Sequence, residues 1–479
     1  MQSNITSPSF GSIGSLFRNT PGADPEWNAQ QPPARRWAML ETLQAKVRSI
    51  ANLRHLPAMA RDPLAFFTTL ARARGPIASF DFALGRQWLI SSPQAIRKVF
   101  VEHHDDLGKD AATMSLKPLF GNGLLTSAGE DWKRQRRFHK PLFQARHIQH
   151  YGERMVAAAA DEEVRPGVTN VQPMMDRIAR RIILEAMFGT ADEAALDIAD
   201  AVETYVKEHE REFMSLARFL PSFVPTRARR QAQQSRRRIE DRLVKMVAER
   251  RRQPGQDLDM LARLVLAQDA EGRPLSDEEL RDAVATLYFG GTETSSNALS
   301  FAIWLLSHHP DIQDALDDER QTVLGGRRAT VKDVKALVRH AAVLDEAMRL
   351  FPPVWALGRR ALRSFEVDGH RIEAGDQLNA SAWVVHRDAK WFENPEAFQP
   401  ERFWSTDKSS RPAMSFLPFG AGQRTCIGTH FARMETVLVL ATWLEGRRVH
   451  AVADRPLRPL PRVTLRPADG AWVNIEVRP

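Results

Sequence analysis

The sequence predicts a mainly α fold with small β-sheets at its margins. Three observations support this fold class. The periodicity of apolar residues is mostly helical from about residue 92 to residue 350. The string PIASFDFALGRQWLISS, residues 76–92, alternates around a glycine-containing turn, as a β-hairpin does. From about residue 450, the strings RVTLRP and AWVNIEVRP return to β-like alternation.

One continuous domain is expected from residue 51 to residue 479, because no internal repeat or long linker interrupts the sequence. Residues 1–50 form a lead-in that begins rich in Ser, Gly, Pro and Asn, and we expect it to be partly mobile. At its end, residues 37–53 have helical spacing of apolar residues. A helix packed on its own domain is favoured there over a helix on a membrane surface.

Two further helices are predicted in the middle of the chain. The arginine-rich residues 226–257 are most simply a solvated helix, and nucleic-acid binding is not expected because no aromatic residues are interleaved. The apolar stripe of this helix consists of Ile239, Leu243, Met246 and Val247. Residues 276–310 predict a long, largely buried helix that begins with a capping box of Ser276 and Glu279.

The composition limits the classes of protein that fit. The chain has 479 residues and a hydrophobic content of 43%, as an ordinary globular enzyme has. No run of eighteen apolar residues and no signal-peptide pattern occur, so a cytoplasmic protein without a transmembrane anchor is expected. The net charge of +8 favours acidic partners but does not separate proteins from nucleic acids. A single cysteine excludes an internal disulfide, a protein-held iron–sulfur cluster and a cysteine-rich zinc site.

That cysteine lies in the string FGAGQRTCIG, directly before a helix-like run. Cys426 has three interpretations: a buried core residue, a nucleophile, or a ligand of a cofactor. A helix N-terminus favours thiolate over thiol. Gly422 and Gly428 suit a backbone that lies flat against a large planar ligand, and Arg424 offers a cation for a carboxylate on that ligand. A nucleophile would need a well-placed histidine base, and a structural cysteine would need neither the arginine nor the glycines. A haem has both an iron that takes a soft ligand and two propionates.

The string resembles the haem-binding loop F-x-x-G-x-R-x-C-x-G of the cytochrome P450 family, the haem-thiolate monooxygenases. The matching residues are Phe419, Gly422, Arg424, Cys426 and Gly428, and Gly420 lies in the same loop. The resemblance implies the cytochrome P450 fold, with haem b between the long central helix and the helix after the cysteine loop. It also implies that Cys426 is the axial ligand of the haem iron. The matches extend in the family's order from about residue 60 to the C-terminus.

A second motif is the string LDEAMRLFPP, in which Glu346 and Arg349 stand three residues apart and therefore share one helix face. The spacing alone says little, because Glu-x-x-Arg recurs elsewhere in the chain and an exposed pair contributes only about 0–1 kcal/mol. The string PERF follows and contains Arg402. The resemblance implies that these three residues form a charge cluster under the thiolate side of the haem. Removal of any one would strand a buried charge and prevent haem incorporation.

A third motif interrupts the long helix. Gly290 and Gly291 should each cost roughly 1 kcal/mol relative to alanine, and the pair Glu293 and Thr294 follows directly. We predict that the helix opens locally to admit a small ligand, to which Thr294 and Glu293 deliver protons through water. The string GGTETS resembles the family's oxygen-binding helix. The resemblance implies O2 as a co-substrate and an acid and alcohol pair that supports its protonation and cleavage.

A fourth stretch, GNGLLTSAGEDWKRQRRFHKPLF, resembles the family's helix that passes the haem edge. Trp132 and Arg136 fall on one face of that helix, so the resemblance implies that they are partners of the haem propionates. Lys109 and Arg359 are candidates for the same role by approximate position.

The resemblance implies a monooxygenase that inserts one oxygen atom from O2 into a lipophilic small molecule of secondary metabolism, by hydroxylation or epoxidation. The segments assigned to the substrate pocket are 107–119, 213–225, 353–358 and the helix turn with Leu287 and Phe289. They are mostly apolar, so a terpenoid, polyketide, fatty-acid derivative or aromatic substrate is expected. Two alternatives remain. One is a haem-thiolate enzyme that performs coupling, desaturation or another non-insertion reaction. The other is a haem sensor, against which Glu293 and Thr294 argue.

Electrons should come from an external ferredoxin or flavodoxin with its reductase. The chain has neither the length for a fused flavin domain nor cysteines for an iron–sulfur cluster of its own. A docking site for an acidic donor is predicted at Lys133, Arg134, Arg137 and Lys140. A monomer is expected.

Overall fold

The computed structural model describes residues 55–478 apart from 83–84, 214, 216, 218–219, 221–223, 253–258 and 405–410. The expected lead-in, residues 1–50, and the helix predicted at residues 37–53 lie outside the described residues.

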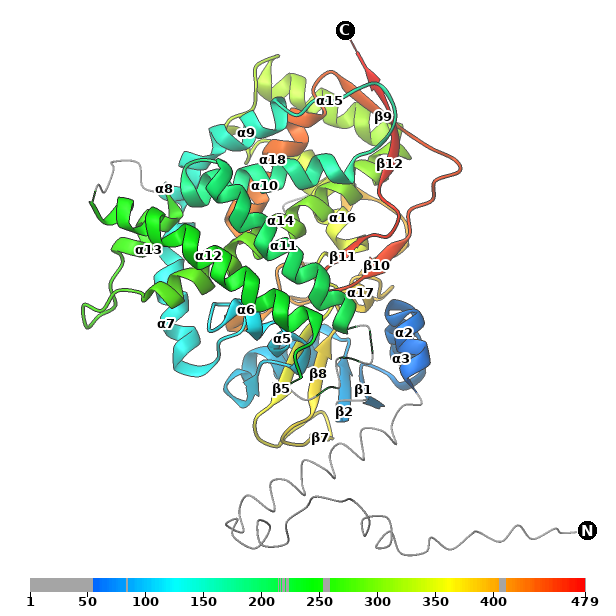
Figure 1. Ribbon diagram of the computed structural model, residues 1–479. Coiled ribbons are helices and arrows are strands. Elements are labelled where there is room, and N and C mark those ends of the chain that lie inside the picture. Colours follow the sequence, from blue (N-terminus) through cyan, green and yellow to red (C-terminus); the bar gives the residue numbers. More distant parts are fainter. Residues whose placement is uncertain are drawn as a thin grey trace, which may run out of the picture.

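Helices form most of the described chain (Figure 1). They are α2 (Leu56–Arg61), α3 (Pro63–Arg74), α4 (Pro93–Arg97), α5 (Ala111–Met114), α6 (Lys117–Phe120), α7 (Gly129–His139), α8 (Ala145–Ile148), α9 (Gly152–Ala160), α10 (Gln172–Phe188), α11 (Glu193–Phe213), α12 (Arg227–Arg252), α13 (Met260–Leu266), α14 (Asp277–Ser307), α15 (Pro310–Leu324), α16 (Val338–Leu350), α17 (Ala382–Val385) and α18 (Thr429–Trp443).

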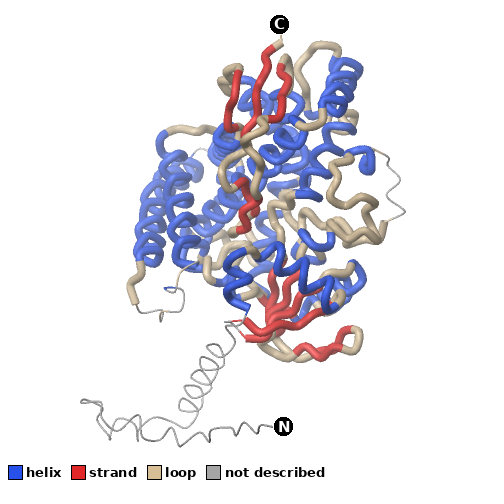
Figure 2. Tube along the Cα trace, turned by 90° about the vertical axis from the view of Figure 1, so that its right-hand side faces the viewer, coloured by secondary structure: helices blue, strands red, loops and turns tan. Residues whose placement is uncertain are grey.

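Small sheets complete the fold, as the sequence predicts. Their strands are β1 (Ile77–Phe82), β2 (Gly85–Ile90), β3 (Leu107–Gly108), β4 (Gly167–Asn170), β5 (Leu357–Ala361), β6 (Phe365–Val367), β7 (His370–Ile372), β8 (Gln377–Ala380), β9 (Arg447–Ala451), β10 (Pro459–Pro461), β11 (Leu465–Pro467) and β12 (Trp472–Val477). One sheet has five strands in the order β1-β2-β8-β5-β3, and another has three in the order β4-β12-β9. These two sheets lie at opposite ends of the helical body (Figure 2).

The predicted hairpin is present. Strands β1 and β2 pair antiparallel from Ile77 opposite Ile90 to Phe82 opposite Gly85, and β2 continues the sheet by pairing parallel with β8. Strand β8 then pairs antiparallel with β5, which places Arg359 on an inner strand directly beside the edge strand β3. The sheet therefore holds the loop after β3 beside β5, although more than two hundred residues separate them in the chain.

Helix α14 is the central element of the fold and has the predicted N-terminus. The Ser276 hydroxyl accepts a bond from the backbone N–H of Glu279 (3.2 Å), and the Glu279 carboxylate accepts one from the N–H of Ser276 (2.9 Å). The helix packs against α10, α11, α12, α16 and α18, so most of its side chains are buried. A helix that is covered on so many sides must be apolar nearly all round, and any polar side chain on it needs a partner or a function.

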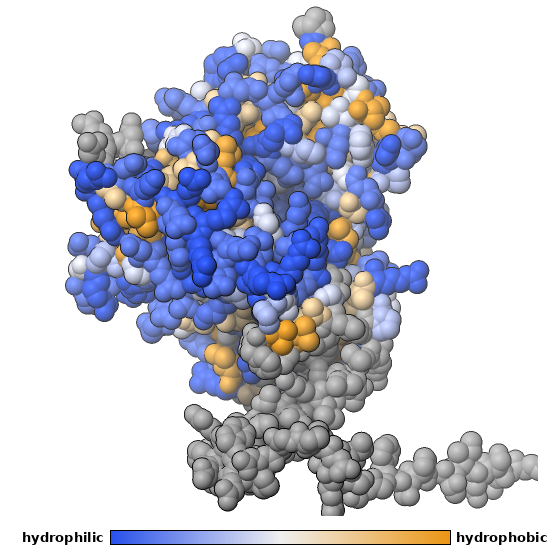
Figure 3. Space-filling model, in the orientation of Figure 1, coloured by the Kyte–Doolittle hydropathy of each residue, from blue (hydrophilic) through white to orange (hydrophobic). Residues whose placement is uncertain are grey.

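The arginine-rich helix α12 is solvated, as predicted. Its buried side chains include the stripe Ile239, Leu243, Met246 and Val247, which packs into the large hydrophobic core. The face that α11 and α12 present in Figure 3 is predominantly hydrophilic. Within the part of the chain that the structure describes, none of the helices is long and apolar enough to cross a bilayer.

Candidate functional site

The cysteine loop begins with a short 3-10 turn, Gly422–Arg424, and ends at α18. The backbone N–H of Cys426 donates to the carbonyl oxygen of Phe419 (2.8 Å), which closes the loop. Gly428 is the N-cap of α18, so the sulfur lies at the N-terminus of this helix, as predicted. The cysteine remains accessible although the fold surrounds it.

The structure gives reasons for the glycines of this loop that the sequence did not suggest. Gly420 and Gly422 both have a positive φ, of 83° and 67°, which glycine adopts most readily. A Cβ atom on Gly422 would lie 2.4 Å from the carbonyl oxygen of Phe100. Close packing of the loop on another backbone segment therefore requires Gly422, a reason separate from the expected room for a planar ligand. Gly428 has only ordinary contacts, because its Cβ would lie 3.5 Å from Phe143.

The surroundings of Cys426 act on its pKa in both directions. Burial raises the pKa of the Cys426 thiol above its ordinary value. A backbone bond from Gly428, a bond with Thr429 and the charge of Arg136 lower this pKa only in part. Desolvation therefore outweighs the helix N-terminus in the ligand-free chain. A sulfur in this position becomes a stable thiolate only when a cation binds it directly.

Four cations converge around the cysteine loop, and we call them the cation cluster: Lys109, Arg136, Arg359 and Arg424. Arg424 lies 4.1 Å from the centroid of the Trp132 ring and donates to the carbonyl oxygen of Ser127 (2.9 Å). Arg136 donates to the carbonyl oxygen of Thr425 (3.2 Å), the residue before the cysteine.

The members of the cation cluster repel one another. Burial first, and then the charges of Arg359 and Arg136, lower the pKa of Arg424 to about 9. Burial and the charges of Arg359 and Arg424 lower the pKa of Lys109 well below its usual value, and burial lowers that of Arg359. Asp110 opposes this effect on Lys109 and Arg359, but its carboxylate caps α5.

Among the described residues, no carboxylate forms an ion pair with any member of the cluster. Buried cations without counter-charges are costly, so this arrangement calls for an anionic ligand. A haem fits the donor set, since its iron takes a thiolate and its two propionates take cations.

One residue that lies beside the cation cluster, His104, was not identified from the sequence. His104 lies with its ring 6.0 Å from that of Trp132, and its pKa is lowered by burial first and then by the charge of Arg424, with Arg359 adding to the effect. It therefore belongs beside the cation cluster. The string HHDDLGKD contains both His104 and Lys109, so proximity to Lys109 was the available signal.

Helix α14 passes through Gly290 and Gly291 without interruption, so the predicted local opening is not observed. The hydroxyl of Thr294 donates to the carbonyl oxygen of Gly290 (2.7 Å), a bond inside the helix that needs no opening. The two glycines differ in their surroundings. A Cβ on Gly290 would meet nothing within 4 Å, whereas one on Gly291 would lie 2.7 Å from the Cδ1 atom of Ile183 on α10. Gly290 and Thr294 therefore face open space in the middle of a buried helix.

Glu293 points to the C-terminal hairpin. Its carboxylate lies 3.5 Å from the guanidinium of Arg466 on β11 and accepts a hydrogen bond from Thr464. Burial raises the pKa of Glu293, Thr464 and Arg466 oppose that shift, and Glu210 and Asp176 add to it. Arg466 was not found in the sequence, where nothing marks it among many arginines.

The Glu-x-x-Arg motif at Glu346 is unlike its repeats. Glu346 and Arg349 are both fully buried and form a bidentate pair with two N–O distances of 2.8 Å. Arg402 adds a third bond to Glu346 (3.2 Å). The remaining Arg349 donors bond to backbone carbonyls between residues 386 and 397. By contrast, in the repeat formed by Glu278 and Arg281 the side chain of Glu278 is 67% exposed.

A cavity of about 680 Å³ opens between α3, α5, α11, β5 and the β10–β11 hairpin. Its apolar lining includes the aromatic residues Phe67, Phe80, Phe213 and Trp355. Asp110 and Gly358 also line it, so it adjoins the cation cluster through their neighbours Lys109 and Arg359.

The predicted segments 107–119 and 353–358 contribute to this lining, and so do Phe213 and Ser215 of the segment 213–225. Several other residues of that segment lie outside the described chain. Among the described residues, Leu287 and Phe289 do not line the cavity, because Leu287 is buried in the core and Phe289 packs on Phe120.

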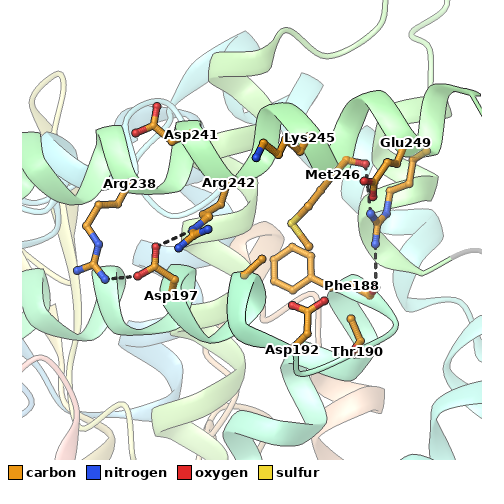
Figure 4. Close-up of a pocket in the computed structure, with 12 residues that line it drawn as sticks. Phe188, Thr190, Asp192, Asp197, Arg238, Asp241, Arg242, Lys245, Met246 and Glu249 are labelled. Carbon is orange, nitrogen blue, oxygen red and sulfur yellow. Dashed lines mark hydrogen bonds and ion pairs between the residues drawn. The ribbon is translucent and has the colours of Figure 1, made fainter.

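A second hollow, of about 800 Å³, lies between α11 and α12 (Figure 4). Its arginines are already neutralised: Arg238 and Arg242 both bind Asp197, and Arg250 binds Asp259 and the carbonyl oxygen of Phe188. None of the predicted site residues lines it, so it is separate from the site.

The predicted docking site is only partly free. Arg134 is half-buried and binds Glu279, Asp269 and the carbonyl oxygen of Pro274. Lys133 is exposed and pairs with Glu130 (2.7 Å). Arg137 and Lys140 are exposed and form no ion pair with the described part of the chain. Arg134 therefore stabilises the fold, contrary to its assignment to the docking site.

The comparisons with known proteins agree with this geometry. Residues 48–471 match the family model of cytochrome P450. Cyclooctatin synthase of Streptomyces melanosporofaciens is 32% identical over 447 residues, which cover 91% of this chain and 95% of that protein. Cyclooctat-9-en-7-ol 5-monooxygenase of the same organism is also 32% identical, over 91% of this chain and 93% of that protein. Pentalenene oxygenase of Streptomyces avermitilis is 30% identical, over 86% of this chain and 92% of that protein. The chain belongs to the cytochrome P450 family and is a monooxygenase of that family.

Proposed function

We propose that this chain inserts one oxygen atom from O2 into a lipophilic terpenoid, with haem held at Cys426. The observation that carries the proposal is the cation cluster, four partly buried charges without carboxylate partners in the described chain beside the single sulfur. When bound, the haem supplies the iron at which dioxygen is activated.

In this proposal the protein's own groups hold the cofactor in two ways. Cys426 provides the thiolate ligand after loss of its proton, and the closed loop fixes the direction of the sulfur. Lys109, Arg136, Arg359 and Arg424 bind the propionates, with Trp132 packed beneath Arg424. Glu346, Arg349 and Arg402 hold the segment that leads to the cysteine loop.

Glu293 and Thr294 move the protons that reduction of O2 requires. Thr294 holds its hydroxyl at the open side of α14, and Glu293 keeps a carboxyl whose pKa is raised by burial. Their positions one residue apart place an acid and an alcohol at the same turn of the helix.

A terpenoid substrate is supported by the cavity and by the relatives. An aromatic-lined space of about 680 Å³ suits a rigid hydrocarbon skeleton better than a charged molecule. Two of the relatives are named for reactions on cyclooctat-9-en-7-ol and on pentalenene.

We expect electrons from an external ferredoxin or flavodoxin with its reductase, and a monomer in the cytoplasm. Exposed Lys133, Arg137 and Lys140 form the docking surface in this proposal, because Arg134 is engaged in the fold. Charge reversal at Arg137 and Lys140 should slow reduction at low salt and lose its effect at high salt. Unchanged reduction by an acidic donor at low salt would contradict this surface.

The absorption spectrum of the reduced protein under carbon monoxide tests the ligand, and labelled O2 tests the reaction. The parent should give the strongly red-shifted Soret band of thiolate ligation, and Cys426→His should lose it. With a surrogate ferredoxin system and a panel of cyclic terpene hydrocarbons and alcohols, the product should carry one labelled oxygen atom. A product without the label would replace the proposal by a non-insertion reaction such as coupling or desaturation.

A further inference from the structure

One arginine of the C-terminal hairpin is shared by two carboxylates from different helices. Arg466 on β11 lies 2.8 Å from the carboxylate of Glu210 on α11 and 3.5 Å from that of Glu293 on α14. Strand β11 packs against α14, and the side chain of Arg466 reaches from it to α11. Glu210 also lines the cavity of about 680 Å³, so this arginine links the cavity wall to the acid of the oxygen-binding helix.

The hairpin that carries Arg466 is fixed to α14. The hydroxyl of the buried Thr464 accepts a bond from Asn297 (3.3 Å) and donates to Glu293. The backbone N–H of Leu465 donates to the carbonyl oxygen of Pro353 (2.8 Å). These bonds leave the Arg466 guanidinium little freedom to follow one carboxylate away from the other.

Several acidic side chains lie in the region that Arg466 links. Glu210 is buried, with an exposed fraction of 7%, and its Oε1 atom has no hydrogen-bond partner among the described residues. On α10, Asp176 faces Glu293 and bonds to Ser296. On α18, Glu435 bonds to Ser295 (2.7 Å), the residue two positions after Glu293. A buried carboxylate that lacks its full set of partners competes for any nearby cation.

We propose that Arg466 is a positioning residue for the Glu293 carboxyl, and that Glu210 competes with Glu293 for the same guanidinium. Arg466 draws the Glu293 carboxylate toward β11, and Glu210 limits how strongly it does so. The inference rests on the proposed function for its meaning in catalysis, but the geometry that it describes stands without a bound cofactor.

The two partners should have opposite effects on the protonation of Glu293. Arg466→Gln removes a cation, so it should raise the pKa of Glu293. Glu210→Gln removes an anion and leaves the guanidinium to Glu293 alone, so it should lower that pKa. An opposite charge within about 4–6 Å typically shifts a pKa by about 1–3, so each change should be at least about one pH unit.

Unfolding measurements on the full-length protein test this without any catalytic assay. The urea midpoints of the parent and of Glu293→Gln are compared from pH 4 to pH 9. Because the pKa of Glu293 is raised in the folded state, the parent loses stability relative to Glu293→Gln as the pH rises from about 4.5 to the folded pKa. The upper end of that window marks the folded pKa. It should move up in the Arg466→Gln background and down in the Glu210→Gln background.

Two further variants separate positioning from mere structural support. Arg466→Lys keeps the positive charge, so the pH range over which stability is lost should match that of the parent. If Arg466 served only as a structural hydrogen-bond donor, lysine would not restore the parent's behaviour. Arg478→Gln is the matched control, since Arg478 forms a comparable half-exposed ion pair with Asp317 (3.3 Å) far from Glu293 in the chain. It should leave the window unchanged.

The turnover readout is the pH profile of product formed per O2 consumed. This profile should shift to higher pH in Arg466→Gln and to lower pH in Glu210→Gln. Windows that shift in the same direction, or that do not shift, would overturn the proposal. If Arg466→Gln does not fold, an unshifted window in Glu210→Gln alone is sufficient to overturn it. If no product forms but the two variants shift the unfolding window in opposite directions, this inference holds and the proposed function is rejected.

Discussion

Arg424→Gln should change the stability of the haem-free and haem-bound protein in opposite directions. Without haem, Arg424 is a partly buried charge that Arg359 and Arg136 repel, and burial with this repulsion lowers its pKa from the ordinary arginine value to about 9. With haem, the same guanidinium would bind a propionate. The substitution therefore removes an unfavourable charge from the haem-free protein and a ligand contact from the haem-bound protein.

The magnitude follows from the pKa of Arg424. At 1.36 kcal/mol per pH unit, the fall from the ordinary arginine value to about 9 corresponds to about 5 kcal/mol. The guanidinium is partly solvated, so we take less than half of this, ~2 kcal/mol. The lost bond to the Ser127 carbonyl oxygen (2.9 Å) offsets ~1 kcal/mol. Haem-free Arg424→Gln should therefore be more stable than the parent by ~1 kcal/mol at pH 7. The haem complex should lose ~1.5–3 kcal/mol of binding, a factor of roughly 10 to 100 in Kd.

Urea unfolding of both forms and haem titration of the haem-free form measure these changes. The sign of the pH dependence provides a second check. A basic group with a lowered folded pKa destabilises the fold below that pKa, and this cost disappears as the pH rises through it. The stability advantage of Arg424→Gln in the haem-free form should therefore shrink above about pH 9. Arg137→Gln, an exposed cation on the same helix as Trp132, is the control and should change neither form. Equal destabilisation of both forms by Arg424→Gln would show that this arginine only supports the fold.

Two other predictions concern buried groups with a matched control nearby. Glu346→Gln should destabilise the protein by ~3–5 kcal/mol and lower its haem content, because it strands the fully buried Arg349. Glu278→Gln, on the exposed repeat of the motif, should cost less than ~1 kcal/mol in the same urea unfolding assay; equal costs would contradict the burial argument. Gly290→Ala should raise the thermal midpoint, since it gains ~1 kcal/mol of helix propensity and its Cβ meets nothing within 4 Å. Gly291→Ala should gain little or nothing, because it must displace Ile183 at 2.7 Å; the reverse order would refute the assigned surroundings.

Local patterns in the sequence predicted the elements that carry the site. The capping box at Ser276, the hairpin at residues 76–92 and the stripe of α12 each depend on residues within one element, and all three are present. The cysteine loop was also recognisable, because its spacing is local. The physical reason for Gly422 was not, since the backbone of Phe100 that approaches it lies more than three hundred residues away.

Contacts between distant elements explain the remaining differences. Arg134 stands in a basic run that looks free in the sequence, yet Asp269 and Glu279 reach it from another part of the chain. His104 and Arg466 carry no motif of their own, and only the fold places them beside Arg424 and Glu293. Lys109 and Arg359 were assigned by approximate position, and the pairing of β3 with β5 explains why they meet.

The net charge of +8 shows why composition alone could not assign a role to the basic residues. On α12 the arginines face solvent or pair with carboxylates such as Asp197, so their charges cost little. In the cation cluster the same residue type is partly buried without a carboxylate partner in the described chain, and the pKa of Arg424 falls to about 9. The difference lies in what stands opposite each guanidinium. A charge that the protein leaves unbalanced at a buried position indicates a ligand of opposite charge, whereas a balanced charge at the surface indicates only solubility. Arg424→Gln and Arg137→Gln test this distinction directly, because they remove equal charges from the two environments.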